Sequence, residues 1–326
     1  VGFTLAGVAC MFAQTFFALL AFRFTQGIFA AGFRVIATSI VRDLTSGRSM
    51  ASILSLIFTV FMIVPIIAPA IGTAVMTFAD WNWTFGILAV SGSIMLFWTH
   101  FRLPATLPVD MRQPLNWRHI GRSYRTVLTT RVAIGYMFAS GIVFGALFSF
   151  IGASEQIFDD VFGRGETLWI WFAIVASGIG VASLTNSRIV QRVGMRRISH
   201  TVLLLFIALS AINLVAMKLS DQNFWVFLPL FTLGFGCFGM MGANFSSLAL
   251  EPLGKIAGYA AAVYGTATTT ISAGIGFFIA RQFDGTVYPV LIGFVCMGIF
   301  SLLIVLWTER GMLFEHAASR GGRVRE

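Results

Sequence analysis

The sequence predicts an all-α membrane protein with about ten transmembrane helices. Of its 326 residues, 57% are hydrophobic and only 11% are charged, and the mean hydropathy is +0.87. A soluble domain of this length could not bury so many apolar side chains. Two further observations support the prediction: basic residues alternate between the loops, and a pair of arginines lies inside one apolar stretch.

Apolar runs between polar breaks mark the expected helices. The first run is too short for a full crossing, and the chain opens with Val1 rather than Met. We therefore interpret the sequence as cut inside or just before a membrane helix. The expected spans are residues 1–13, 16–41, 51–77, 83–103, 132–151, 168–189, 198–217, 224–250, 257–280 and 287–308.

Basic residues alternate between the two sides of the predicted membrane. One set of loops holds 17 of the 22 basic residues, and the other set holds 3. The positive-inside rule places the richer set in the cytoplasm, so the net charge of +9 reflects topology and requires no nucleic-acid partner. Acidic residues gather on the opposite side, in one loop with Glu155, Asp159, Asp160 and Glu166.

The cysteines and histidines predict neither a metal site nor a cofactor. The three cysteines are scattered through apolar spans, and the four histidines fall at cytoplasmic ends or loops, too shallow for a proton relay. No GxxxxGK[ST] loop occurs, so ATP is not the expected energy source. These residues are Cys10, Cys237, Cys296, His100, His119, His200 and His316.

One long connection, residues 104–131, separates four predicted helices from six. Its apolar residues recur at roughly helical spacing, which predicts either a basic helix on the cytoplasmic leaflet or a solvated linker with a short helix. The expected domains are the remainder of an N-terminal half (1–103), this linker (104–131), a six-helix C-terminal half (132–308) and a cytoplasmic tail (309–326).

The two halves show a faint internal repeat. Asp43 and Glu251 each follow a long apolar run on the cytoplasmic side, at an offset of 208 residues, and residues 70–72 resemble residues 274–276. If four helices correspond to the last four of six, two helices are missing from the front. Parallel six-helix halves around a midplane site are a transporter architecture.

Arg23 and Arg34 lie inside the apolar stretch 16–41. At about 1.5 Å per residue the stretch reaches roughly 39 Å, enough to cross a hydrocarbon core of about 30 Å. The two arginines return to one helix face, roughly 16 Å apart along the axis. We expect this face to meet water, protein or a substrate. The alternative is that one or both side chains snorkel to the membrane surface.

Three stretches carry motifs. Residues 23–31 read RFTQGIFAA, residues 65–73 read PIIAPAIGT, and residues 249–258 read ALEPLGKIAG. The first resembles the fourth-helix motif RxxQGxGaa of the major facilitator superfamily, with Phe29 where Gly is usual. The second resembles the antiporter motif GPxxGG, with Ala68 and Thr73 departing from Gly. The third is similar to a phrase typical of the Bcr/CflA branch of drug:proton antiporters.

This resemblance covers nearly the whole chain and implies a major facilitator fold with about ten of twelve transmembrane helices present. It implies export of small amphipathic drugs in exchange for protons by alternating access. The protein would act as a monomer in a bacterial inner membrane, with the proton gradient as energy source and no cofactor. The alternatives are export of a metabolite, such as a sugar, amino acid or peptide, and an integral membrane enzyme or receptor, for which no nucleophile or metal-ligand cluster is seen.

Small residues and prolines in the motifs predict close helix packing or gating. Small side chains let membrane helices approach, and proline frees backbone carbonyls and bends a helix. The loop 191–197, QRVGMRR, also resembles a degenerate copy of the family's GxxxDRxGRR loop. The residues singled out are Gly27, Pro65, Ala68, Pro69 and Gly72 for packing or gating, and Asp43, Arg192, Gly194, Arg196 and Glu251 in the cytoplasmic loops.

Aromatic rings and a few polar groups predict the substrate path. Such groups suit amphipathic compounds that are bound promiscuously, although a Phe stripe in a membrane helix more often faces lipid or core. No carboxylate lies mid-membrane in any predicted span, and the family's proton-titrating Asp would precede Val1, where the arginines could pair with it. The candidates for path and coupling are Arg23, Gln26, Phe33, Arg34, Tyr136, Phe144, Phe148 and Asn244.

Overall fold

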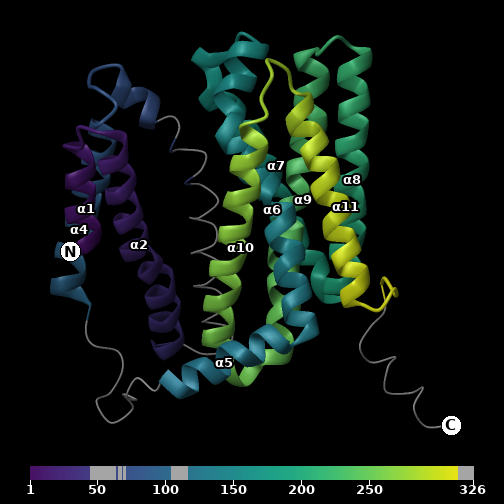
Figure 1. The fold of residues 1–326 in the computed structure, drawn as a ribbon, viewed down its shortest axis with the longest axis horizontal. Helices are drawn as coiled ribbons and strands as arrows, with labels where there is room; N and C mark the ends of the chain where they lie inside the picture. Colours follow the sequence, from purple (N-terminus) through teal and green to yellow (C-terminus); the bar gives the residue numbers. More distant parts are fainter. Residues whose placement is uncertain (45–63, 65–67, 69–70, 104–116, 315–326) are drawn as a thin grey trace. The chain divides into compact units, whose positions relative to one another are not determined.

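The computed structural model describes residues 1–44, 64, 68, 71–103 and 117–314, drawn in Figure 1. The chain forms two compact units, Val1–Leu115 and Asn116–Glu326. Within the described residues all regular structure is helical, and eight helices are long and apolar enough to cross a membrane. The predicted all-α membrane fold is confirmed.

Unit 1 contains α1 (Gly2–Met11), α2 (Phe16–Leu44) and α4 (Trp83–Arg102). Helix α1 packs against both others, and its buried residues are small: Ala6, Gly7 and Cys10. A Cβ on Gly7 would lie 3.4 Å from the Cβ of Ala89 in α4 and 3.0 Å from Gln26 Nε2 in α2, so the bare glycine leaves room for the Gln26 side chain. The predicted spans 1–13, 16–41 and 83–103 are therefore helices. Most of the span 51–77 lies outside the described residues.

Unit 2 contains the six long helices that the sequence predicts for its C-terminal half. Helix α6 packs against α9, α10 and α11, while α9 also packs against α7 and α8. A π-helical turn (Ile157–Val161) and a short 3-10 turn (Gly165–Thr167) join α6 to α7. The helices are α6 (Arg131–Gln156), α7 (Leu168–Val193), α8 (Met195–Leu219), α9 (Phe224–Leu250), α10 (Ala257–Ala280) and α11 (Tyr288–Thr308).

Aromatic side chains of α9 fill the centre of unit 2. Phe227, Phe231 and Phe235 lie one helical turn apart and stack with ring centroids 4.7 and 4.5 Å apart. Phe150 of α6 and Phe294 of α11 pack against the same rings at 5.0 and 5.7 Å. Such ring pairs stabilise helix contacts where lipid supplies no hydrophobic drive for association.

The basic connection forms a helix, α5 (Trp117–Thr129), which belongs to unit 2. It packs against α10 and α6 through Ser123 and Val127, which are buried one turn apart. Arg122 and Arg125 point away from this face and are exposed. The predicted helix therefore exists and is docked on the bundle, while residues 104–116 of the expected linker lie outside the described part.

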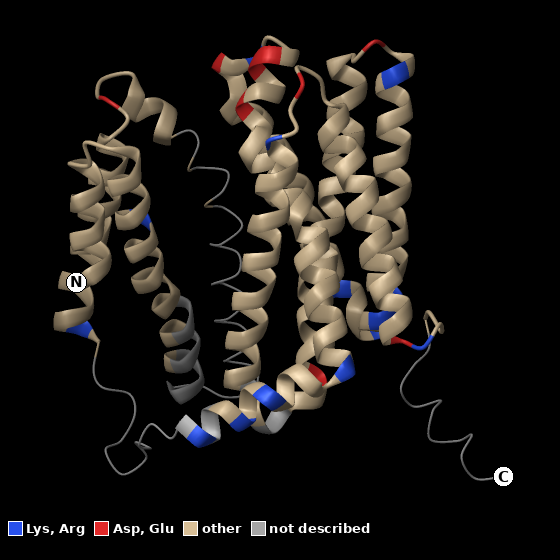
Figure 2. Ribbon diagram, viewed as in Figure 1, with Lys and Arg blue, Asp and Glu red and all other residues tan. Residues whose placement is uncertain are grey.

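Charged residues separate along unit 2. Figure 2 shows most Lys and Arg at the end that carries α5, and a group of acidic residues at the opposite end. The acidic end includes the π-helical turn with Asp159 and Asp160, and the basic end includes the junction of α7 and α8 with Arg192 and Arg196. The charge alternation predicted for this half is therefore present in three dimensions.

Candidate functional site

Arg23 and Gln26 form a polar pair in the apolar first half of helix α2. Arg23 Nη1 donates a hydrogen bond of 2.9 Å to Gln26 Oε1, three residues further along the helix. The Arg23 guanidinium also lies 5.3 Å from the ring centre of Phe85 in α4. Gln26 is only 3% exposed, and its Nε2 has no hydrogen-bond partner among the described residues. The pair thus holds one positive charge and an amide NH₂ group that donates to no described residue of unit 1.

The other candidates on α2 are open or lie outside the description. Phe33 is exposed and touches Phe3 of α1 edge-on, with ring centres 5.4 Å apart. Gly27 has no described heavy atom within 4 Å of the position a Cβ would take. The side chains of Arg34 and Asp43 lie outside the described part, so their predicted roles stay predictions.

The antiporter motif is described only in part. Pro65 and Pro69 fall outside the described residues, while Ala68 is exposed. A Cβ added to Gly72 would meet nothing within 4 Å among described residues. The predicted role of these residues in packing or gating therefore stays a prediction.

Phe144, Phe148 and Asn244 lie between packed helices of unit 2. Phe144 contacts Phe238 of α9, with ring centres 5.3 Å apart, and Phe148 packs where Gly276 of α10 has no side chain. The Nδ2 group of the buried Asn244 donates to Asn186 Oδ1 in α7 at 2.8 Å. These side chains join α6, α7, α9 and α10 within the unit, and their predicted contact with substrate remains a prediction.

Tyr136 is fully buried and belongs to a polar network that the sequence did not predict. Its hydroxyl donates to Glu309 Oε1 at 2.8 Å and lies 2.9 Å from His200 Nε2. Arg196 Nε donates to the same carboxylate oxygen at 3.0 Å, and Arg196 Nη2 lies 3.4 Å from Glu251 Oε2. The network ties α6, α8, the end of α9 and the end of α11 together at the basic end of unit 2.

Two of these residues were missed for different reasons. Glu309 directly follows α11, as Glu251 directly follows α9, so the pattern of an acid after a long apolar helix could have indicated it. His200 lies near the start of α8, at the cytoplasmic end that the sequence predicts, but its complete burial beside Tyr136 could not be predicted from that position. A buried carboxylate is stable only with partners, and Glu309 has both Arg196 and Tyr136.

The junction of α7 and α8 is made by Gly194. Its φ of 89° is a conformation that glycine adopts without steric cost, and α8 begins directly after it. Arg192 precedes the turn and is exposed, while Arg196 follows it and enters the network. The predicted loop motif therefore positions one arginine for an ion pair with a buried carboxylate.

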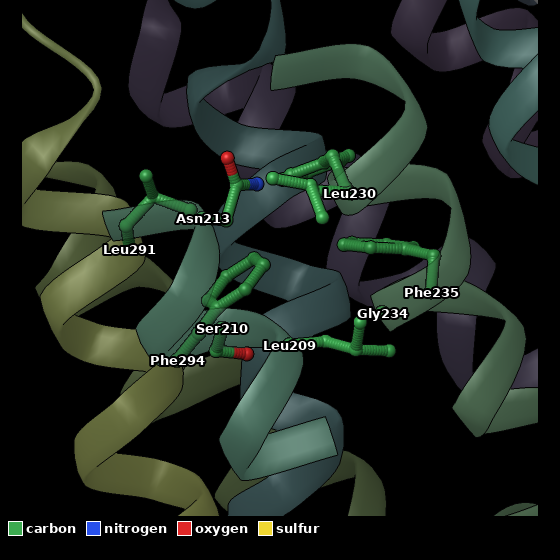
Figure 3. A pocket seen from close by; sticks show the side chains of 9 residues that line it. Leu209, Ser210, Asn213, Leu230, Gly234, Phe235, Leu291 and Phe294 are labelled. Atoms are coloured by element: carbon green, nitrogen blue, oxygen red, sulfur yellow. The ribbon is translucent and has the colours of Figure 1, made fainter. Parts of the chain in front are cut away.

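A small void lies between α8, α9 and α11 (Figure 3). Its volume is about 10 Å³, and Asn213 Oδ1 borders it without a hydrogen-bond partner among described residues. Such a volume is close to the least that holds one water molecule. The void is far too small for a drug-sized compound, and none of the predicted path residues lines it.

Long apolar helices with charges gathered at their ends define a polytopic helical membrane protein. Residues 1–280 match the Major Facilitator Superfamily, so the chain belongs to this superfamily of membrane transporters. The resemblance predicted from the motifs is confirmed.

Relatives and a solved structure agree with this assignment. The chain is 29% identical to a bicyclomycin resistance protein homolog of Haemophilus influenzae, covering 90% of this chain and 74% of the relative. It is 26% identical to the multidrug resistance protein MdtL of Shigella dysenteriae, covering 95% and 77%. A bacterial homolog of the human lysosomal transporter Spinster shares the fold, with a TM-score of 0.60 and 13% identity over 95% of this chain and 79% of that one.

Proposed function

We propose that the protein exports small amphipathic drugs in exchange for protons, by alternating access in a bacterial cytoplasmic membrane. The observation that carries this proposal is the similarity over 90% of the chain to a bicyclomycin resistance homolog. The similarity to a multidrug resistance protein over 95% of the chain supports the same substrate class. The proton gradient supplies the energy, and the transporter acts as a monomer without a cofactor.

The chemistry of α2 supports a role in coupling. A guanidinium group is not deprotonated in proteins, so another group must carry the exchanged proton. The side-chain amide nitrogen of Gln26, the neighbour of Arg23, is buried and donates a hydrogen bond to no described residue. A carboxylate that meets this pair when deprotonated, and leaves it when protonated, would link proton binding to movement of the helix.

Transport in everted membrane vesicles tests the proposal. A fluorescent amphipathic cation should accumulate when a proton gradient is imposed, and a protonophore should abolish the accumulation. Sugars, amino acids and peptides serve as competitors. If one of these compounds is transported and the dye is not, the protein is a metabolite exporter and the drug proposal fails.

Arg34→Ala tests the predicted path. We expect dye transport to fall without a loss of expression, because the arginine shares a helix face with Arg23. Arg281→Ala, at the acidic end of unit 2, is the matched control and should transport normally. Normal transport by Arg34→Ala would remove Arg34 from the path.

A further inference from the structure

The chain after α11 folds back onto the start of α8. Arg310 adopts a φ of 57° and Gly311 a φ of 80°, and the Gly311 N–H bonds to the carbonyl of Leu306 at 2.8 Å. This turn ends the helix and brings residues 312–314 against the network of Tyr136 and His200.

Phe314 is the point at which this segment is held. Its N–H donates to His200 Nδ1 at 3.2 Å, and its carbonyl accepts from Arg197 Nε at 3.4 Å. Its ring meets the imidazole edge-on, with centres 5.9 Å apart. Phe314 also has a φ of 70°, a backbone conformation that residues other than glycine rarely adopt. Such a backbone persists only where its surroundings hold it, so the docked segment depends on these contacts.

The hydrogen bonds fix which ring nitrogen of His200 carries the proton. A backbone amide can only donate, so Nδ1 must accept from Phe314 and the hydrogen must lie on Nε2. Nε2–H then donates to the Tyr136 oxygen, whose own hydrogen is used in the bond to Glu309. Every donor in this chain of bonds therefore has one acceptor, and the imidazole is neutral.

We propose that His200 is a proton-operated latch for residues 309–314. A second proton on His200 would occupy Nδ1, where the lone pair now accepts from the Phe314 amide. Two N–H donors would then face each other, and the segment would leave the basic end of unit 2. The docked state excludes a proton that the released state binds, so docking weakens as the pH falls.

The charges around His200 do not by themselves decide whether its ring takes up a second proton. Glu309 attracts a proton to the ring, while Arg196 on the same helix repels it, and these two groups are paired with each other. Whatever the balance of these charges, a charged ring would have an N–H at Nδ1 that faces the Phe314 N–H, and a neutral ring would not. Among the described residues, the ionisable groups joined to His200 through these bonds are Tyr136 of α6, Arg196 and Arg197 of α8, Glu251 after α9, and Glu309 after α11.

Hydrogen–deuterium exchange of the full chain in lipid nanodiscs tests the latch. After correction for intrinsic exchange, we expect the amides of residues 309–314 to exchange faster, on the order of tenfold, between about pH 7.5 and about pH 5. Protection that does not change over this range would overturn the proposal. The latch does not depend on what the protein transports.

Two variants separate His200 from general effects of acid. His200→Asn keeps an oxygen acceptor near the position of Nδ1 but cannot take up a proton, so exchange of residues 309–314 should become independent of pH. His100→Asn removes an exposed histidine of α4 and should behave as wild type. An unchanged pH response in His200→Asn would contradict the latch.

Nitrogen NMR of histidine in the unaltered protein supplies a test that requires no variant. We expect His200 to carry its hydrogen on Nε2 at neutral pH, and to gain the second proton over the pH range in which residues 309–314 are released. A hydrogen on Nδ1 at neutral pH, or release without protonation, would refute the assignment.

Discussion

Helices α2 and α9 are both long, apolar and rich in phenylalanine, but they differ in burial. In α2, only 6% of the apolar stretch Phe16–Phe33 is buried within the described structure. The stretch Phe224–Leu253, which contains α9, is 56% buried. Phe24 and Phe29 of α2 are exposed, whereas Phe231 and Phe235 of α9 lie in the centre of unit 2. Hydropathy alone therefore does not predict how much of an apolar helix is buried among the described residues.

The glycines of the two units follow the same difference. Gly239 of α9 lies directly against the Ile179 carbonyl of α7, so α7 already occupies the space that a side chain would need. Gly27 and Gly72, which belong to the family motifs, face open space among described residues. We infer that substitutions in unit 2 act mainly on stability, and that substitutions at the motif face of unit 1 act mainly on transport.

The largest effect is expected for Arg196→Gln. Removing the guanidinium takes away the positive charge that lies 3.0 Å from the buried Glu309 carboxylate, and breaking a buried ion pair costs about 3–5 kcal/mol. Unfolding of the purified protein in detergent measures this loss. Arg192→Gln changes an exposed arginine four residues away and should alter stability by less than about 0.5 kcal/mol. Equal losses in the two variants would show that the network does not stabilise unit 2.

Gly239→Ala should give the next effect. The new Cβ would meet the Ile179 carbonyl, so α7 and α9 must separate at a cost of about 1–3 kcal/mol. Gly27→Ala is the matched control, because its Cβ enters open space and alanine favours a helix. Thermal unfolding of both variants measures the difference in stability. A similar loss in Gly27→Ala would show that the open face of α2 is packed in the folded protein.

The smallest effect concerns the surface of α5. In nanodiscs, anionic lipid should protect the amides of residues 117–129 more than zwitterionic lipid does, by about 1 kcal/mol per arginine that reaches the headgroups. Replacing Arg122 and Arg125 by Gln should remove this difference, and Arg281→Gln at the opposite end should not. Equal protection in both lipids would favour a solvated linker helix over one that lies on the membrane.

The sequence predicted the helices well because crossing a membrane requires a set length of apolar chain. The predicted spans 224–250 and 257–280 coincide with α9 and α10. The span 132–151 was too short, since α6 continues to Gln156 through polar residues that hydropathy reads as loop.

The site was less predictable because its contacts join distant parts of the chain. Glu309, the partner of Tyr136, lies 173 residues further on, and His200 lies 64 residues further on. A single aromatic residue in an apolar run carries no sign of such a partner. The Arg23–Gln26 bond could be expected, because residues three apart share a helix face.

The division of roles between the units is tested most directly by two buried amides. Gln26→Leu should abolish proton-driven dye transport at a cost of only about 0.5–1.5 kcal/mol in stability, because the one described bond that it removes joins Gln26 Oε1 to Arg23, which is exposed. Asn244→Leu should lower stability by about 1–3 kcal/mol, because it leaves Asn186 Oδ1 unpaired. Both variants are measured for transport and for stability. The account predicts that Gln26→Leu loses transport and keeps most of its stability. Normal transport by Gln26→Leu would contradict it.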